Sequence, residues 1–310
     1  MSLYHARPGV RLLLGDAHEQ LAGMAGESAD CIVTSPPYWG LRDYQMPGQY
    51  GQEATAGEYV ERLRAVFAQA RRVLAADGTC WLVLSDCYGG SWGNYIAPGS
   101  TAPTAGDQRR SRRHGRHRPP ATRLPAKSLL GLPWRVADAL AADGWTVRNA
   151  VVWHKPNARP ESVADRLASR YELVFLLVRS RRYWFDLDAL RQPAPAPPST
   201  RGSRRPHRQR HHRGRNPGDV WSIPTRPFRS AHFAVFPLEL PLRCIAGGCK
   251  PAGTVLDPFT GAGSTALAAR QLDRQFLGVE LNPAYLDLAV TRLDRQARKS
   301  PGTPDSRRTA

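Results

Sequence analysis

The feature that most limits how this chain can fold is a repeated alternation of short apolar runs with longer stretches in which apolar residues recur every three to four positions. The short runs are typical of buried strands, and the longer stretches are typical of amphipathic helices. Strands separated largely by helices predict an α/β fold with a doubly wound, mostly parallel, seven-stranded Rossmann-like sheet. The seven predicted strands are Val10–Leu14, Ala29–Thr34, Thr79–Leu84, Thr146–Trp153, Tyr171–Val178, Thr254–Leu256 and Gln275–Val279.

The helical pattern and the cysteine content complete this outline. The longest unbroken apolar run has six residues, Leu173–Val178, whereas a membrane helix needs about 20, so no membrane span is expected. The five cysteines form no CxxC pair, which argues against a disulfide framework or a zinc knuckle and predicts a cytoplasmic protein with reduced thiols. The predicted helices are Glu58–Leu74, Pro133–Ala142, Pro237–Ala246, Ser264–Arg270 and Pro283–Arg295.

The net charge of +18 is concentrated in three segments. Residues 109–127 carry eight basic side chains and residues 201–215 carry seven, both without an acid, and residues 291–310 add an excess of four. Solvated arms are one interpretation of such runs. Because arginine dominates and its guanidinium suits phosphates and guanine edges, the charge favours a nucleic-acid surface. Two Pro-, Arg- and His-rich insertions, 88–127 and 191–230, are therefore candidate segments for DNA contact and target recognition, and residues 301–310 are expected to be a flexible tail.

The segment VLDPFTGAGSTALAARQ combines a strand, a glycine-rich turn and the start of a helix. Gly261 and Gly263 allow the backbone to approach a ligand, and the helix that begins at Ser264 offers free N–H groups. The next strand ends at Glu280, a carboxylate suited to ribose hydroxyls. The spacing alone is close to that of an NAD-binding loop. Asp257 at the strand end would repel a pyrophosphate, and it favours a ligand with a cationic amino-acid portion and a ribose, such as S-adenosylmethionine (SAM).

A second strand-end loop reads Ser-Pro-Pro-Tyr-Trp-Gly. Pro37 favours an extended Pro36, and neither proline has an N–H, so the loop presents acceptors together with the Ser35 hydroxyl. Tyr38 and Trp39 offer ring faces on which a base can stack. Acceptors beside a stacking ring suit the exocyclic amine of a base flipped out of a duplex. A rigid turn with core aromatic residues is the alternative interpretation of this loop.

Together these motifs resemble those of a known family. TSPPYW is similar to the catalytic motif of amino-group DNA methyltransferases, in which Asp, Asn or Ser precedes Pro-Pro and an aromatic residue, and DPFTGAGST resembles their SAM-binding motif. Because the proline loop comes more than two hundred residues before the glycine loop, the motif order resembles that of the circularly permuted β class. The stretches WLVLSDCYGG, VVWHKPNARPESVADRLASRYELVFLLVRS and HFAVFPLELPLRCI are also similar to segments of these enzymes, although Phe233 stands where the family more often has proline.

The resemblance implies a single SAM-dependent methyltransferase domain over residues 1–300. It implies that the Ser35 hydroxyl and the Pro36 carbonyl accept hydrogen bonds from the target amine, that Pro37 completes the loop and that Tyr38 stacks on the flipped base. Because the methyl group of SAM is already electrophilic, no metal site is expected. The residues implied to bind the cofactor are Asp16, Thr34, Phe236, Asp257, Pro258, Phe259, Gly261, Gly263, Ser264, Glu280 and Asn282.

The resemblance also bears on the methylated atom. Serine before Pro-Pro-Tyr is commoner among the N4-cytosine members of the family, so methylation of cytosine N4 in double-stranded DNA is favoured over adenine N6. A cognate restriction endonuclease is a candidate partner, and a monomer or a homodimer is expected. The alternatives are an NAD-dependent oxidoreductase, which explains only the glycine loop, a non-catalytic nucleic-acid-binding protein, which explains only the charge, and a methyltransferase acting on RNA or on protein glutamine.

Overall fold

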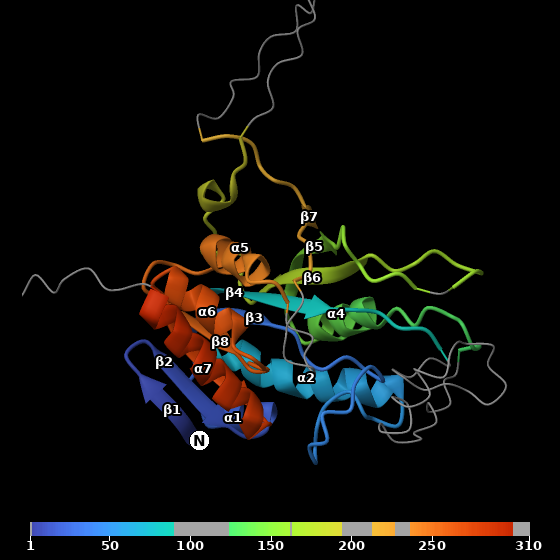
Figure 1. Ribbon diagram of the computed structural model, residues 1–310, viewed down its shortest axis with the longest axis horizontal. Helices are drawn as coiled ribbons and strands as arrows, with labels where there is room; N and C mark the ends of the chain where they lie inside the picture. The colour runs from blue at the N-terminus through green and yellow to red at the C-terminus, as the bar shows by residue number, and fades with distance from the viewer. Residues whose placement is uncertain (1, 90–123, 162, 194–212, 227–235, 300–310) are drawn as a thin grey trace, which may run out of the picture.

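A mixed sheet of nine strands lies at the centre of the protein (Figure 1). The computed structural model describes residues 2–89, 124–161, 163–193, 213–226 and 236–299. The strand order is β1-β2-β9-β8-β3-β4-β6-β5-β7. The pairs β1–β2, β4–β6 and β5–β6 are antiparallel. The strands are β1 (Leu3–Arg7), β2 (Val10–Leu14), β3 (Ala29–Thr34), β4 (Leu74–Leu84), β5 (Thr146–His154), β6 (Tyr171–Val178), β7 (Val220–Ser222), β8 (Thr254–Asp257) and β9 (Gln275–Glu280).

Helices cover both faces of this sheet (Figure 1). One face carries α1 (Ala17–Ala22), α2 (Ala56–Val73) and α4 (Leu132–Ala142). The other face carries α5 (Glu239–Gly248), α6 (Ser264–Gln271) and α7 (Pro283–Lys299). Because both faces are buried, successive residues of the central strands enter different clusters: Phe175 of β6 packs under α2 and α4, and Leu176 packs on the opposite side.

The seven predicted strands are all present, and the α/β, mostly parallel architecture is confirmed. The expected number of seven strands is too low, because the sheet also includes β1 and β7 at its two edges. Val220–Ser222 falls in the insertion 191–230, which the sequence places outside the sheet, yet it pairs in parallel with β5. Edge strands bury few side chains, and β7 buries only Trp221 among its three residues, so neither edge produces the apolar run that marks a strand.

Backbone contacts close the ends of both basic insertions. Tyr88 forms an antiparallel bridge with Leu129, and Gln192 forms one with Arg215. Residues 90–123, 194–212 and 227–235, which include most of these two insertions, lie outside the described residues together with the predicted tail 301–310. The charged segments 109–127 and 201–215 are each inserted between two chain positions that the fold holds together.

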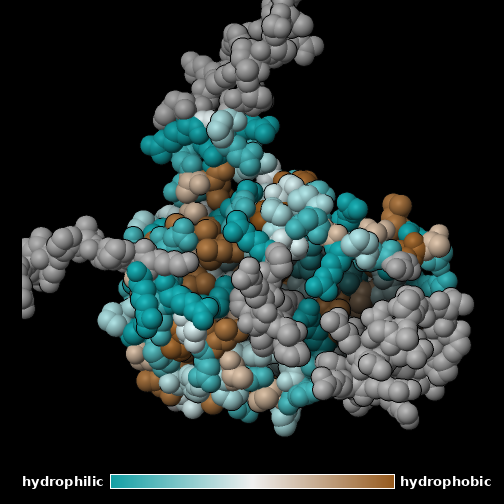
Figure 2. All heavy atoms as spheres, in the orientation of Figure 1, coloured by the Kyte–Doolittle hydropathy of each residue, from teal (hydrophilic) through white to brown (hydrophobic). Residues whose placement is uncertain are grey.

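The described surface is largely hydrophilic in the view of Figure 2, with hydrophobic residues in separate small patches. No helix among the described residues combines the length and apolar character that crossing a membrane requires.

Candidate active site at the carboxyl edge of the sheet

The predicted site residues gather where neighbouring parallel strands end. Strands β2, β9, β8, β3 and β4 lie side by side and all run in the same direction. Their carboxyl ends therefore meet at one edge of the sheet, which is where open α/β sheets bind ligands. The glycine loop leaves β8 and the proline loop leaves the adjacent β3, so two motifs more than two hundred residues apart in sequence become neighbours.

Asp257 joins these two loops. Its Oδ1 accepts a hydrogen bond from the Thr34 hydroxyl at 2.6 Å and from the Phe259 N–H at 3.0 Å, while its Oδ2 accepts one from the Thr265 hydroxyl at 2.7 Å. The residue is only 1% exposed, and burial raises the pKa of the carboxyl group to about 6. Asp257 thus ties β8 to β3 and α6, and its side chain offers almost no surface to a ligand.

Glu280 fixes the other side of the glycine loop. Its Oε2 accepts a hydrogen bond from the Gly261 N–H at 2.8 Å, and its Oε1 accepts one from the Asn282 N–H at 2.9 Å. The Gly15 N–H donates to the Glu280 carbonyl oxygen at 2.9 Å, which brings the following residue, Asp16, to the same edge. Burial is the main reason that the pKa of the Glu280 carboxyl group rises to about 7, and the nearby Asp257 raises it further.

Asp16 and Asn282 have local structural roles at the starts of helices. Asp16 is the N-cap of α1 and its Oδ1 accepts from the Glu19 N–H at 3.1 Å. Asn282 precedes α7, and its Oδ1 accepts from the Ala284 N–H at 3.0 Å. Both side chains therefore lie at this edge in fixed orientations.

Backbone geometry explains the glycine at position 263. Gly263 has φ of +78°, and a Cβ there would lie 2.8 Å from the Cβ of Ala289 on α7. A larger residue would be strained in its backbone and would also push α7 away. From α7, Arg292 donates to the Ala262 carbonyl and, at 3.3 Å, to the Ser264 hydroxyl, so this arginine holds the start of α6 in place.

The proline loop is held by its tyrosine. The Tyr38 hydroxyl donates to Glu172 Oε2 at 2.8 Å, and the Ser35 hydroxyl lies 3.1 Å from the Tyr38 hydroxyl. Lys155 donates to the other oxygen of Glu172. Burial and the Glu172 carboxylate raise the pKa of Tyr38 well above its usual range. Pro36 is buried, and Ser35, Pro37 and Tyr38 are half-buried.

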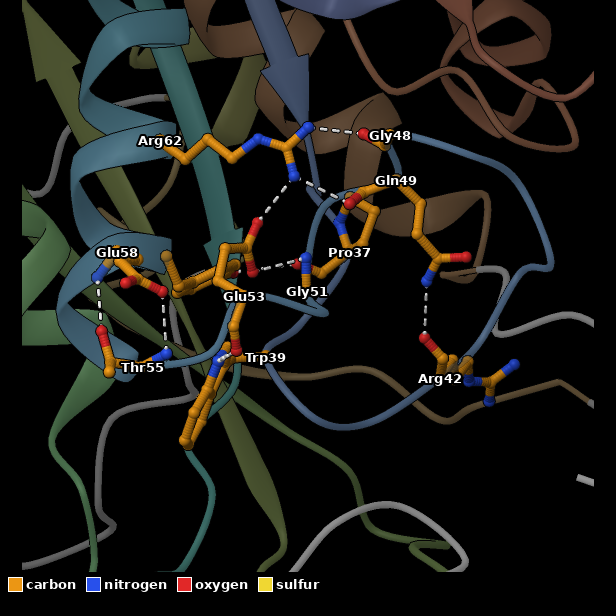
Figure 3. Close-up of polar contacts among 11 residues, drawn as sticks. Pro37, Trp39, Arg42, Gly48, Gln49, Gly51, Glu53, Thr55, Glu58 and Arg62 are labelled. Carbon is orange, nitrogen blue, oxygen red and sulfur yellow. Dashed lines mark hydrogen bonds and ion pairs between the residues drawn. The ribbon is translucent and has the colours of Figure 1, made fainter. Parts of the chain in front are cut away.

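Helix α2 and the segment that precedes it support this loop from one side (Figure 3). Arg62 donates to the carbonyls of Gly48 and Gln49 and, at 3.0 Å, to Glu53 Oε1. Glu53 in turn accepts from the Gly51 N–H at 2.9 Å. Gly51 has φ of +89°, and a Cβ there would come within 2.7 Å of the Tyr38 carbonyl oxygen.

The remaining supports of the proline loop also come from α2. Tyr59 donates to the Pro37 carbonyl at 2.9 Å, and a capping box of Thr55 and Glu58 begins the helix. The loop is therefore a rigid structure, fixed at both its backbone and its side chains.

Three aromatic residues differ in their relation to the site. Trp39, predicted as a second stacking face, is 3% exposed and donates its indole N–H to the Glu53 carbonyl, so that interpretation is wrong. Phe259 follows the buried Pro258 and packs edge-on against Tyr50, with ring centroids 5.3 Å apart. Phe236 packs against the cluster under α5–α7, whereas Phe259 packs against the cluster under α1, α2 and α4.

Sequence reasoning did not single out Glu172 and Lys155. Lys155 directly follows β5 and Glu172 lies in β6, opposite Trp153 in the register of the two strands. A lone acid directly before the apolar run of β6 is the signal that marks this position, but it gains meaning only when the hairpin brings it to Tyr38. Among the described residues, no three His, Cys, Asp or Glu side chains come together in a way that could hold a metal ion.

Comparisons with known proteins agree with this architecture. The model of the DNA methylase family that covers N6 and N4 enzymes matches residues 29–291. The chain is 39% identical over 286 residues to the type II methyltransferase M.SmaI of Serratia marcescens, covering 92% of this chain and 91% of that protein. It is 42% identical over 286 residues to the type II methyltransferase M.Cfr9I of Citrobacter freundii, covering 92% and 88%.

Solved structures show the same fold. PvuII DNA methyltransferase (cytosine-N4-specific) superposes with a TM-score of 0.64 at 18% identity, over 92% of this chain and 86% of that one. A putative DNA modification methylase from Thermus thermophilus, complexed with S-adenosyl-L-methionine, superposes with a TM-score of 0.56 at 26% identity, over 94% and 96%. These matches decide against an NAD-dependent oxidoreductase and a non-catalytic nucleic-acid-binding protein, and the chain belongs to the N6/N4 family of SAM-dependent DNA methyltransferases.

Proposed function

We propose that this enzyme transfers the methyl group of SAM to the exocyclic N4 amine of a cytosine flipped out of double-stranded DNA. The observation that carries the proposal is the hydrogen bond between Thr34 and Asp257, 2.6 Å long. It joins the last residue of β3, directly before Ser35 and Pro36, to the start of the glycine loop. An amine acceptor loop and a cofactor loop thus share one edge of the sheet, which is the arrangement that direct transfer between two bound molecules requires.

The residues at this edge fit the cofactor. Asp257 and Glu280 are two buried carboxyl groups whose pKa values are both raised, so a ligand with a positive charge near them would relieve an electrostatic cost. Gly261 leaves room beside the backbone, where a Cβ would find no atom closer than the Phe259 carbonyl oxygen at 3.9 Å, and its N–H is already oriented by Glu280. We therefore propose that this turn holds the methionine part of SAM.

The other predicted contacts follow from position. We propose that Glu280 and Asn282 face the ribose, that Asp16 faces the adenine side, and that Thr34, Phe236, Pro258, Phe259 and Ser264 shape the remaining walls. Because Asp257 is 1% exposed, we propose that it acts by organising the turn and by its charge rather than by direct contact with the ligand.

SAM supplies an electrophilic methyl group on a sulfonium, so the remaining demand on the protein is to activate the amine. The lone pair of an exocyclic base amine is delocalised into the ring. Acceptance of its N–H bonds by the Ser35 hydroxyl and the Pro36 carbonyl favours a pyramidal nitrogen, which resembles the transition state more than the planar ground state. Tyr38 is proposed to stack on the flipped base, and its hydrogen bond to Glu172 fixes its ring.

Digestion of DNA methylated by the purified enzyme should release N4-methyldeoxycytidine as the modified nucleoside in mass spectrometry. The choice of N4 rests on the resemblance of Ser35-Pro36-Pro37-Tyr38 to the N4 members of the family. The variant Ser35→Ala tests the role of the hydroxyl. It should lose activity by about 10-fold or more if the hydroxyl accepts an amine N–H. N6-methyldeoxyadenosine as the sole product would overturn the choice of base, and no methylated nucleoside on any DNA would overturn the proposed function.

We further propose that residues 1–300 form one methyltransferase domain and that the insertions 88–127 and 191–230 contact DNA. Between the bridged residues Gln192 and Arg215, arginines 201, 204, 205, 208 and 210 are changed together to glutamine to test this proposal. Non-specific DNA binding of this variant should weaken, and the slope of log K against log salt should become shallower by about 0.9 for each lost phosphate contact. An unchanged slope would assign these arginines no phosphate contact, and an altered recognition sequence would instead indicate base contacts.

The matched control for the measurement of DNA binding replaces an equal number of arginines on the helices that cover the sheet, away from the insertions.

The type II methyltransferases among the relatives also support the proposal that a restriction endonuclease accompanies this enzyme.

A further inference from the structure

The hydroxyls of the proline loop belong to a chain of four polar groups that begins on the hairpin of β5 and β6. Lys155 donates to Glu172, Glu172 Oε2 lies 2.8 Å from the Tyr38 hydroxyl, and that hydroxyl lies 3.1 Å from the Ser35 hydroxyl. The Lys155 side chain is 19% exposed and the Glu172 side chain is 12% exposed, so the ion pair is largely removed from water. Such a chain of hydrogen bonds has a direction, and the direction decides what Ser35 can offer to a base.

The donor and acceptor capacities of the four groups allow one direction only. The Lys155 ammonium can only donate, and the Glu172 carboxylate paired with it can only accept. The Tyr38 hydroxyl must therefore use its single proton to donate a hydrogen bond to Glu172. It can then take part in the bond with Ser35 only as an acceptor, so the Ser35 hydroxyl donates to Tyr38.

We infer that Glu172 is a positioning residue that makes the Ser35 oxygen an obligate hydrogen-bond acceptor toward the substrate. With its proton committed to Tyr38, the Ser35 oxygen presents only lone pairs to the base pocket. The group that it recognises must bring its own N–H, as the exocyclic amine of cytosine or adenine does, whereas a ring nitrogen or a carbonyl oxygen would face an unfavourable acceptor. The inference rests on the proposed function, because it assigns the polarity of the same site.

Other contacts already support the loop, which separates the role of Glu172 from support of the backbone. The proline loop is already held from α2, through Tyr59 and the Pro37 carbonyl at 2.9 Å, and through the contacts of Glu53. The pKa of Tyr38 is raised well above its usual range, which keeps the proton on its hydroxyl. The backbone of the loop is thus held independently of the bond from Tyr38 to Glu172, which orients the Tyr38 side chain and sets the direction of the hydroxyls.

Glu172→Gln tests the inference because it keeps the size and shape of the side chain. The amide carbonyl turns to Lys155, so the amide N–H donates to Tyr38, which reverses the chain and turns the Ser35 proton toward the substrate. Steady-state kinetics should show kcat reduced by about 10- to 100-fold, the loss of one charge-assisted hydrogen bond, with KM for DNA and SAM affinity within about twofold. The matched control is Glu61→Gln on α2, which also removes an acid from an ion pair, with Arg64, and should leave kcat unchanged.

A double-mutant cycle with Tyr38→Phe identifies the route of the effect. Because Glu172 acts through the Tyr38 hydroxyl, Glu172→Gln should lower kcat further by no more than about twofold when Tyr38 is already phenylalanine. Equal losses in both backgrounds, or a wild-type kcat in Glu172→Gln, would overturn the inference while leaving methylation by the wild-type enzyme intact. A wild-type enzyme that methylates no DNA would overturn the proposed function and the inference with it.

A spectroscopic measurement provides a readout independent of turnover. Tyr38 is identified in the NMR spectrum of protein labelled with 13C at tyrosine Cζ by the signal missing in Tyr38→Phe. In Glu172→Gln the chemical shift of this signal at neutral pH should differ from that of the wild type, because the Tyr38 hydroxyl no longer donates to a carboxylate. An unchanged chemical shift would show that the Tyr38 hydroxyl does not sense Glu172, and would overturn the inference.

Discussion

Acidification from pH 8 to pH 5 is expected to stabilise the cofactor-free protein, opposite to the common behaviour of proteins whose carboxylates are paired. Burial raises the pKa of Asp257 to about 6 and that of Glu280 to about 7, from ordinary values of 3.8 and 4.5. The folded protein therefore binds protons more tightly than the unfolded chain. The stability that protonation brings is fully present below the ordinary values, and it is lost as pH rises through about 6 for Asp257 and about 7 for Glu280.

The size of the effect follows from the same values. At about 1.4 kcal/mol per pKa unit, the portions of the two shifts between pH 8 and pH 5 amount to about 4 kcal/mol in the free energy of unfolding. Chemical denaturation at several pH values measures it. Glu280→Gln serves as the comparison, because the general repulsion within a chain of net charge +18 affects both proteins alike. A difference between wild type and Glu280→Gln that does not vary with pH would contradict the prediction.

Replacing Asp257 with alanine is expected to weaken SAM binding by about 1.5–3 kcal/mol and to lower the free energy of unfolding by about 2–4 kcal/mol. The carboxylate accepts hydrogen bonds from Thr34, Phe259 and Thr265, and its removal leaves these buried donors without this partner. The glycine turn then loses the hydrogen bond that orients the Phe259 N–H at its start. Isothermal titration with SAM and denaturant unfolding measure the two effects separately.

Asp257→Asn distinguishes the hydrogen bonds by which Asp257 organises the turn from the effect of its negative charge. Asparagine keeps the shape and one acceptor oxygen but carries no charge. If attraction of the sulfonium and the amino group contributes, the asparagine variant loses SAM affinity nearly as much as the alanine variant while keeping more of its stability. An alanine variant that is folded and binds SAM as tightly as the wild type would show that Asp257 has no part in the cofactor site.

Both loops of the site could be predicted from the sequence because their chemistry is local. A proline has no N–H wherever it stands, and Gly263 is required by its own backbone angle, φ of +78°. The strands that lead into the loops are buried on both faces, so their apolar runs are evident in the sequence. Helix α1 and strand β7 were missed, because six and three residues are too short to establish a periodic pattern.

The roles of individual side chains were harder to predict. Nothing in the sequence separates Tyr38 from its neighbour Trp39, since both are aromatic residues after two prolines. Burial separates them: Trp39 is 3% exposed within the core and Tyr38 remains half-buried at the edge. Burial depends on the segment around Glu53 and on α2, which fold over the loop from later in the chain.

The sequence by itself determined the fold class, the two loops and their order, because hydrophobic periodicity and the backbone properties of proline and glycine are encoded residue by residue. Only the tertiary structure decided which groups meet. Thr34 and Asp257 are 223 positions apart, and Tyr38 and Glu172 are 134 apart. Their contacts exist because β8 inserts beside β3 and because β6 pairs with β4. The direction of the hydroxyls at Ser35 and the raised pKa of Asp257 both follow from those pairings, since they depend on charge and burial contributed by distant parts of the chain.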